Sequence, residues 1–217
     1  MFVGHYAASL ALKKFETRAS LGMLFLSVQL VDILFFPFVL LGIERVNIIE
    51  NYTDSTHFQL EYMPYTHSLL GSALWALAAY ALFRWVVVKR HSVALVIALA
   101  VFSHWILDFI SHTPDLPLWT DTSIKLGLGL WNSAIATYLV EAGLLIGALW
   151  LYLSSTTATS KGGKYGMIVF VGLMILMNIS NIFGPVGTDS KLVMAVSALV
   201  AYFLFAAVAF WLDKKRS

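Results

Sequence analysis

The stretch "SVALVIALAVFSHWILDFIS", residues 92–111, is almost wholly apolar over its whole length. At 1.5 Å per helical residue, about 20 apolar residues match the hydrocarbon thickness of a bilayer, so this stretch predicts a transmembrane helix. It also carries His104 and Asp108 at an interval of four, and His112 follows at the same interval. Ionisable side chains are costly inside a membrane, so the same segment indicates a functional site.

Similar stretches lie on both sides of this one. Further spans are expected near residues 19–43, 66–88, 131–154, 165–183 and 192–212. The 217-residue chain is 59% hydrophobic and only 12% charged, with a mean hydropathy of +0.81. A soluble domain has about 25% charged residues. We therefore expect an all-α, polytopic membrane protein in which residues 1–217 form a single domain with six transmembrane helices.

The charges in the short loops predict an orientation. Lysine and arginine gather before the first span, after the second, after the fourth and after the sixth, whereas the other loops are acidic or mixed. The basic residues are Lys13, Lys14, Arg18, Lys89, Arg90, Lys161, Lys164, Lys214, Lys215 and Arg216. Because basic loops stay on the cytoplasmic side, both termini are expected in the cytoplasm.

The composition also excludes several classes of function. The chain has no cysteine, which excludes disulfides, thiolate metal sites and cysteine nucleophiles. Its net charge of +2 gives no indication of nucleic-acid binding. No internal repeat is visible, which disfavours a transporter built from two inverted halves.

The segment Phe2–Leu12 is apolar but too short to cross a membrane. It could be an amphipathic helix on the inner surface, or a half-helix that rises from Lys13 into the bundle. A half-helix would place His5 about 12 Å above Lys13. That depth coincides with the layer described next, which favours the half-helix.

Ionisable and amide side chains within the predicted spans share one layer. At 1.5 Å per residue, all of them fall between the middle of the membrane and its outer surface. They are His5, Asp32, His67, His104, Asp108, His112, Glu141, Asn178 and Asn181. Three of them, at positions 104, 108 and 112, occupy an arc of roughly 80° on one helix face. The layer predicts a metal centre or a pathway for protons or ions; a purely structural hydrogen-bond layer is the third interpretation.

A divalent cation fits this layer because it would compensate carboxylates that are costly to bury unpaired. Imidazole and carboxylate ligands suit zinc, iron, manganese or nickel. Such a mixed set without thiolates is typical of a catalytic site rather than a structural one.

Two motifs carry a resemblance to a known family. "THSL" at 66–69 and "SHWILDFISH" at 103–112 resemble the bacterial inner-membrane family of metal-dependent hydrolases described as LexA-binding. The order of the layer's residues also resembles the zinc-dependent phospholipase C and single-strand nuclease families. That resemblance implies one ion held by Asp32, His67, His104 and Asp108, a second held by His112 and Glu141, and a third by His5 and Asp108. Those families place a histidine where this chain has Thr137, so one or two ions are expected rather than three.

The expected function is therefore a membrane-embedded metal-dependent hydrolase in a bacterial inner membrane, with zinc as the favoured ion. The resemblance and the location indicate a phosphoester in a lipid or lipid-linked substrate, with Asp32 or Glu141 as general base. The residues expected to contact the substrate are Arg45, Asn132, Asn178 and Asn181. The alternative is a transporter coupled to protons or divalent cations, which the apolar inner stretches "VALVIALA" and "LLIGALWLYL" disfavour.

Overall fold

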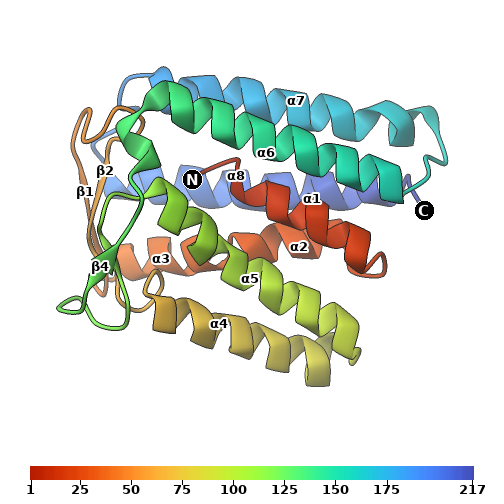
Figure 1. Ribbon diagram of the computed structural model, residues 1–217, viewed down its shortest axis with the longest axis horizontal. Coiled ribbons are helices and arrows are strands. Elements are labelled where there is room, and N and C mark those ends of the chain that lie inside the picture. Colours follow the sequence, from red (N-terminus) through yellow and green to blue (C-terminus); the bar gives the residue numbers. More distant parts are fainter.

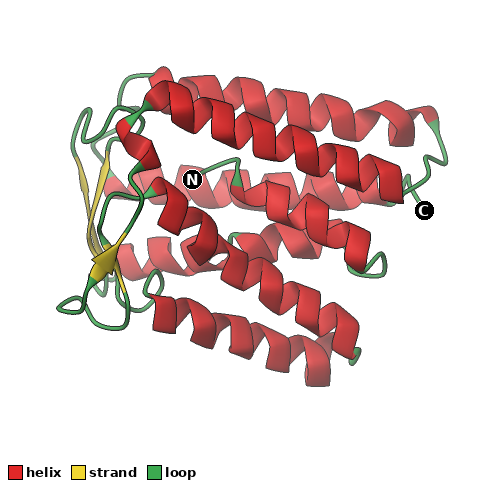
Figure 2. Ribbon diagram, in the orientation of Figure 1, coloured by secondary structure: helices red, strands yellow, loops and turns green.

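Helices make up most of the molecule, and its strands lie together at one end (Figure 2). The computed structural model describes all residues from 1 to 217. The helices are α1 (His5–Phe15), α2 (Leu21–Val28), α3 (Leu30–Leu40), α4 (Leu69–Leu82), α5 (His91–Ser111), α6 (Ala134–Ser155), α7 (Lys161–Phe183) and α8 (Lys191–Asp213). A π-helical turn, η1 (Phe83–Val87), continues α4, and a 3-10 turn, η2 (Leu130–Asn132), precedes α6.

Five helical segments are long and apolar enough to cross a membrane, namely α4 with η1, α5, α6, α7 and α8. The bent pair α2 and α3 makes a sixth. Their outward faces are apolar, as Leu77, Leu176 and Val200 show with exposed fractions of 63%, 61% and 59%. The prediction of an all-α, polytopic membrane protein is confirmed.

The two ends of the bundle differ, since the strands lie at one of them and the C-terminus at the other (Figure 1). One end carries two antiparallel pairs, β1 (Arg45–Ile48) with β2 (Phe58–Tyr62), and β3 (Leu116–Pro117) with β4 (Lys125–Leu126). We call it the hairpin end. The loops at the opposite end, and the C-terminus, carry the basic clusters, so we call it the basic end. Which end faces the cytoplasm stays a prediction.

Helix α1 lies inside the bundle, packed against α2, α5 and α6. Its residues His5, Tyr6, Ser9 and Leu10 are buried. The interpretation of this segment as a helix on the membrane surface is therefore wrong, and the half-helix is correct. The helix also continues past Leu12 to Phe15.

The first predicted span is broken rather than continuous. Helices α2 and α3 meet at Gln29 with a bend of 47°. At this break the carbonyl of Val28 accepts a hydrogen bond from His104 of α5 at 2.7 Å. This hydrogen bond therefore links the first span to the polar residues of α5. Because α3 begins just after the break, Asp32 lies in its first turn.

Candidate metal centre

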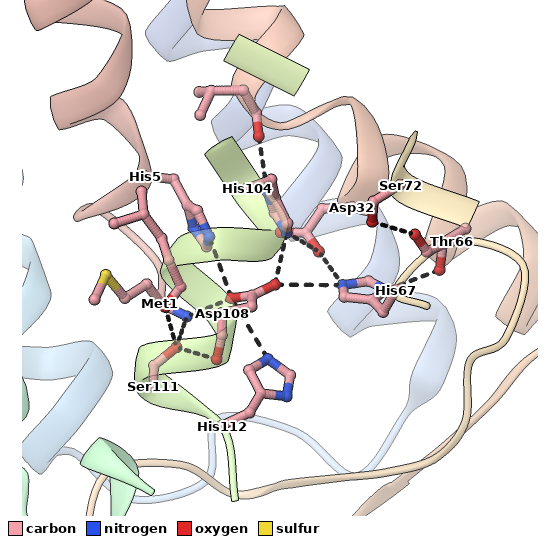
Figure 3. A network of polar contacts seen from close by, with 12 residues as sticks. Met1, His5, Asp32, Thr66, His67, Ser72, His104, Asp108, Ser111 and His112 are labelled. Carbon is pink, nitrogen blue, oxygen red and sulfur yellow. Dashed lines mark hydrogen bonds and ion pairs between the residues drawn. The ribbon is translucent and has the colours of Figure 1, made fainter. Parts of the chain in front are cut away.

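Six of the predicted residues gather at one place inside the bundle (Figure 3). His5 comes from α1, Asp32 from α3, and His104 and Asp108 from α5. The other two, His67 and His112, sit just before α4 and just after α5. All but Asp32 are at most 3% exposed.

Asp108 is the middle of the group. Its Oδ2 lies 3.0 Å from Nε2 of His104, and its Oδ1 lies 3.2 Å from Nε2 of His5 and 3.5 Å from Nε2 of His112. The nitrogen of Met1 donates to the same Oδ1 at 3.0 Å. One carboxylate thus contacts α1, α5 and the residue that follows α5, because α1 and α5 pack together.

Asp32 forms the second part of the group. Its Oδ1 lies 3.2 Å from Nε2 of His67 and 3.6 Å from Nε2 of His104. Its Oδ2 accepts a hydrogen bond from the Tyr202 hydroxyl of α8 at 2.9 Å. The hydroxyl leaves Oδ1 as the oxygen that faces the imidazoles.

The hydrogen bond of His104 at its other nitrogen decides which ring atom faces the carboxylates. Nδ1 lies 2.7 Å from the Val28 carbonyl, and a carbonyl can only accept. Nδ1 therefore carries a proton. In the neutral ring, Nε2 is then an acceptor that points at Asp108 and Asp32.

His67 is held in the same way by a longer chain of contacts. The buried carboxylate of Glu44 accepts from the Thr66 hydroxyl at 2.7 Å and from the Thr66 amide at 3.0 Å. The hydroxyl has one proton, which it donates to Glu44, so it accepts from Nδ1 of His67 at 2.7 Å. Nε2 of the neutral ring is again the free acceptor, and it faces Asp32.

His112 repeats the pattern, since its Nδ1 lies 2.8 Å from Oδ1 of Asp115. Its Nε2 faces Asp108. His5 differs, because neither of its ring nitrogens makes a hydrogen bond although the ring is fully buried; Nε2 only lies near Asp108, at 3.2 Å. Its ring stacks on that of His104 with centroids 3.9 Å apart.

These contacts bring acceptor nitrogens and carboxylate oxygens to within 3.0–3.6 Å of one another, which is unfavourable unless something positive lies among them. The ammonium of Met1 lies beside Asp108, but its ion pair does not extend to Asp32. Protonating all four rings would crowd positive charge into a buried site, which burial disfavours. A divalent cation relieves the contacts directly, and imidazoles with an Nδ1 proton on an acceptor are the usual form of metal-bound histidine.

The geometry offers two overlapping sets of three ligands. His5, His104 and Asp108 form one, and Asp32, His67 and His104 form the other; the ligand atoms of each set lie within 4.8 Å of one another. The buried group could therefore hold a metal ion, and its residues fit one. The identity of the metal is not indicated by the site.

Glu141 belongs to a different arrangement. Its carboxylate accepts from the backbone amides of Gly4 at 2.8 Å and Phe2 at 3.3 Å, and from the amide of Asn178 at 3.4 Å. No ion-pair contact joins it to His112, with which the resemblance groups it. Thr137, at the place of the missing histidine, donates to the Leu130 carbonyl instead.

A cavity of about 670 Å³ opens beside the group. Its lining includes Asp32, His67, Asp108, His112 and Glu141, together with residues from α3, α7, α8 and the hairpin end. Three of the candidate ligands, Asp32, His67 and Asp108, thus face a space that a substrate-sized molecule can fill, and so does Glu141.

The predicted substrate-binding residues divide into two pairs. Asn181 lines the cavity, and Asn178 supports Glu141 from behind. Arg45 is exposed on β1, where it lies 3.6 Å from Glu61, and Asn132 belongs to η2; neither lines the cavity. Their positions give no support to contact with a substrate.

Two residues that hold the candidate ligands in place were not predicted from the sequence. From the sequence, Glu44 is only one of several charges in a loop. Its position directly after a predicted span is the only sign of a further role. Tyr202 lies in a span without ionisable residues, and a single hydroxyl among aliphatic and aromatic neighbours is no pattern. Both reach the site only through the packing of distant segments.

Comparison with family models, with curated proteins and with solved structures found no match. The resemblance of the "THSL" and "SHWILDFISH" motifs therefore stays a hypothesis. The function has to be argued from the site itself.

Proposed function

We propose that this protein is a membrane-embedded, metal-dependent hydrolase that cleaves a phosphoester in a lipid or lipid-linked substrate. The observation that carries the proposal is the fixed orientation of three buried imidazoles. His67, His104 and His112 each hold Nδ1 on an acceptor and turn Nε2 toward Asp32 or Asp108 beside a cavity.

Asp32, His67, His104 and Asp108 are the residues that would hold the ion, and zinc suits these ligands. A bound divalent ion would lower the pKa of water and stabilise charge on the ester oxygens. The cysteine-free ligand set and the adjoining cavity favour a catalytic site over a structural one.

Glu141 is the residue that we assign as general base. It lines the cavity, and backbone amides fix its carboxylate without an imidazole partner. The oxygen of water would bond to phosphorus while a P–O ester bond breaks. The proton of water would pass to Glu141 and then to the leaving oxygen. The Asn181 amide in the same cavity can donate a hydrogen bond to the developing charge.

The test combines metal content with turnover in the purified protein. We expect His104→Ala and Asp108→Ala to lose both the bound metal, measured by elemental analysis, and the hydrolysis of bis-p-nitrophenyl phosphate and of phosphatidylglycerol in mixed micelles. His91→Ala is the matched control, because His91 is exposed at the basic end and contacts Tyr80. Full metal content in both site variants would overturn the proposal.

Transport is the alternative for the same residues, and it needs a route from the site to the basic end. On that side of the site, Leu10, Leu24 and Val28 are fully buried members of the apolar core. This packing favours hydrolysis. Flux of protons or zinc into liposomes, lost in Asp108→Ala, would instead favour transport.

A further inference from the structure

Four residues of α7 and α8 line the cavity and are exposed at the same time: Met177, Ser180, Asn181 and Ser197. Met177 and Ser197 lie farthest from the hairpin end. Met177 of α7 is 51% exposed, and Ser197 of α8 is also exposed. Met177 lies six residues before the end of α7 at Phe183, and Ser197 lies six residues after the start of α8 at Lys191. Both are therefore about 9 Å from the hairpin end, at the same depth.

The cavity thus opens sideways between α7 and α8. Around this opening the exposed residues are apolar, including Leu173, Leu176, Val193 and Val200 with exposed fractions of 52% to 61%. In a membrane these side chains contact acyl chains. At the depth of Met177 and Ser197 the opening therefore faces lipid.

Contacts between loops cover part of the hairpin end of the cavity. Nε2 of His57 lies 3.0 Å from the Gly184 carbonyl, which joins the segment before β2 to the end of α7. Ser55 donates to the Trp131 carbonyl at 2.9 Å and so joins the same segment to η2. A molecule that passes between these loops would have to break these contacts, whereas the side opening requires no such change.

The lining restricts the charge of what can bind. It contains no lysine or arginine, but it contains the carboxylates of Asp32, Asp108 and Glu141. A divalent ion would offset two of these three negative charges, and the N-terminal ammonium of Met1, which donates to Asp108 at 3.0 Å, offsets the third. The lining then holds no further cation for a second negative charge on the ligand.

The lining also restricts the polarity of the head group. Hydroxyl and amide side chains surround the part of the cavity nearest the hairpin end: Ser55, Thr56, Ser180, Asn181 and Thr188. These groups can bond to alcohols as donors and as acceptors. Apolar side chains such as Phe36, Met194 and Ala198 line the cavity alongside them.

We propose that the opening between α7 and α8 is the binding site for the acyl chains of a phosphodiester lipid with an uncharged, hydroxylated head group. The chains lie between Met177 and Ser197, and the singly charged phosphodiester lies near Asp32 and Asp108. This assignment rests on the proposed function for the role of the phosphodiester, but the binding of the lipid does not require turnover.

Photocrosslinking tests the site without relying on catalysis. The metal-loaded protein is reconstituted in vesicles of phosphatidylethanolamine and phosphatidylglycerol that contain a trace of phosphatidylglycerol with a diazirine near the head-group end of one acyl chain. After irradiation, mass spectrometry locates the crosslinked residues. We expect crosslinks on the facing surfaces of α7 and α8, at Met177, Ser197 and their neighbours.

Two variants fill the opening from its two sides. Ser197→Trp and Met177→Trp should each lower this crosslinking by about tenfold. Leu77→Trp is the control, since Leu77 is exposed on α4, away from the opening, and does not line the cavity. Metal content equal to the wild type in the two blocking variants shows that they fold. Unchanged crosslinking in both, or equal crosslinking on the exposed face of α4, overturns the site.

Competition tests the charge of the head group. Unlabelled phosphatidylglycerol should displace the probe, and phosphatidic acid, whose monoester carries more negative charge, should need about a tenfold higher concentration. Phosphatidic acid acting as well as phosphatidylglycerol would overturn the assigned class. Specific crosslinking in a protein without hydrolysis would refute the proposed function and leave the lipid site standing.

Discussion

At the scale of single residues, the histidines of the site owe their orientation to partners that do not touch the cavity. Glu44 acts on His67 through the Thr66 hydroxyl, and the Val28 carbonyl acts on His104. Such outer contacts orient metal-binding imidazoles and raise their basicity. Glu44 is a positioning residue in this sense, since only its neighbour contacts a candidate ligand.

Replacing Glu44 should therefore weaken metal binding. We expect Glu44→Gln to lower zinc affinity by about 10–100-fold. The carboxylate accepts three hydrogen bonds, from the amides of Tyr65 and Thr66 and from the Thr66 hydroxyl, and the side-chain amide of Gln cannot accept all three. Competition with a chelator of known affinity measures the change. Glu61→Gln is the control, since Glu61 is exposed on β2. Equal affinities in the two variants would show that Glu44 does not position His67.

A substitution at Glu141 tests whether this residue acts as a general base or as a metal ligand. If it removes the proton from water, Glu141→Gln should reduce kcat by about 10²–10⁴-fold and leave the metal content unchanged. The comparison of elemental analysis with turnover decides between the roles. Loss of metal in this variant would instead make Glu141 a ligand, as the family resemblance implies.

The site residues could be predicted from the sequence to the extent that they are ionisable and lie in apolar surroundings. His5, Asp32, His67, His104, Asp108 and His112 were found in this way, and the structure brings them together. Glu44 was not found, because its role depends on a hydrogen bond across 22 positions of the chain. Arg45 was chosen for its charge alone, and its contact is Glu61.

At the scale of elements, the break between α2 and α3 shows what a local pattern misses. Proline inside a helix removes a hydrogen bond and usually marks a break, so Pro37 is where the first span would be expected to fail. Instead α3 continues through Pro37 and the break falls at Gln29. The contact between His104 and the Val28 carbonyl belongs to the tertiary structure, and no local signal predicts it.

The basic end is held by a buried ion pair that links α1 to α8. Nζ of Lys13 lies 2.8 Å from Oδ2 of Asp213, which also accepts from the Leu21 amide. Asp213→Ala leaves a buried ammonium unpaired and should destabilise the protein by about 3–5 kcal/mol. Unfolding in detergent measures this.

The control for that prediction is the pair of Asp121 and Lys125, 2.8 Å apart on the surface. Because both side chains are about one-third exposed, Asp121→Ala should change stability by less than about 1 kcal/mol. Similar losses of stability from both substitutions would mean that the buried pair of Lys13 and Asp213 stabilises the protein no more than a surface pair does.

At the scale of the whole molecule, the number of spans could be predicted because each one satisfies a length and composition rule by itself. The order in which they pack could not, since it depends on contacts between segments far apart in the chain. The sequence does predict that the polar residues lie at a similar depth, because the depth of a residue follows from its distance along the helix from the nearer end.

Orientation in the membrane is a prediction for the whole chain. The absence of cysteine lets one introduced thiol report one loop. In intact cells, Thr122→Cys near β4 should react with a membrane-impermeant maleimide, and Thr157→Cys at the basic end should react only after lysis. Both positions are exposed. Reaction of Thr157→Cys in intact cells would reverse the orientation.

The candidate ligands and the walls of the cavity come from different parts of the chain. All of the histidines and aspartates of the group precede residue 113, whereas the side opening belongs to α7 and α8. Apart from Tyr202, which bonds to Asp32, and Asn178 and Asn181 beside Glu141 and the cavity, the last two helices are free to vary without disturbing the chemistry. Divergence of such a protein would then proceed by exchanging its C-terminal third, so that one inherited reaction centre serves a series of different lipids.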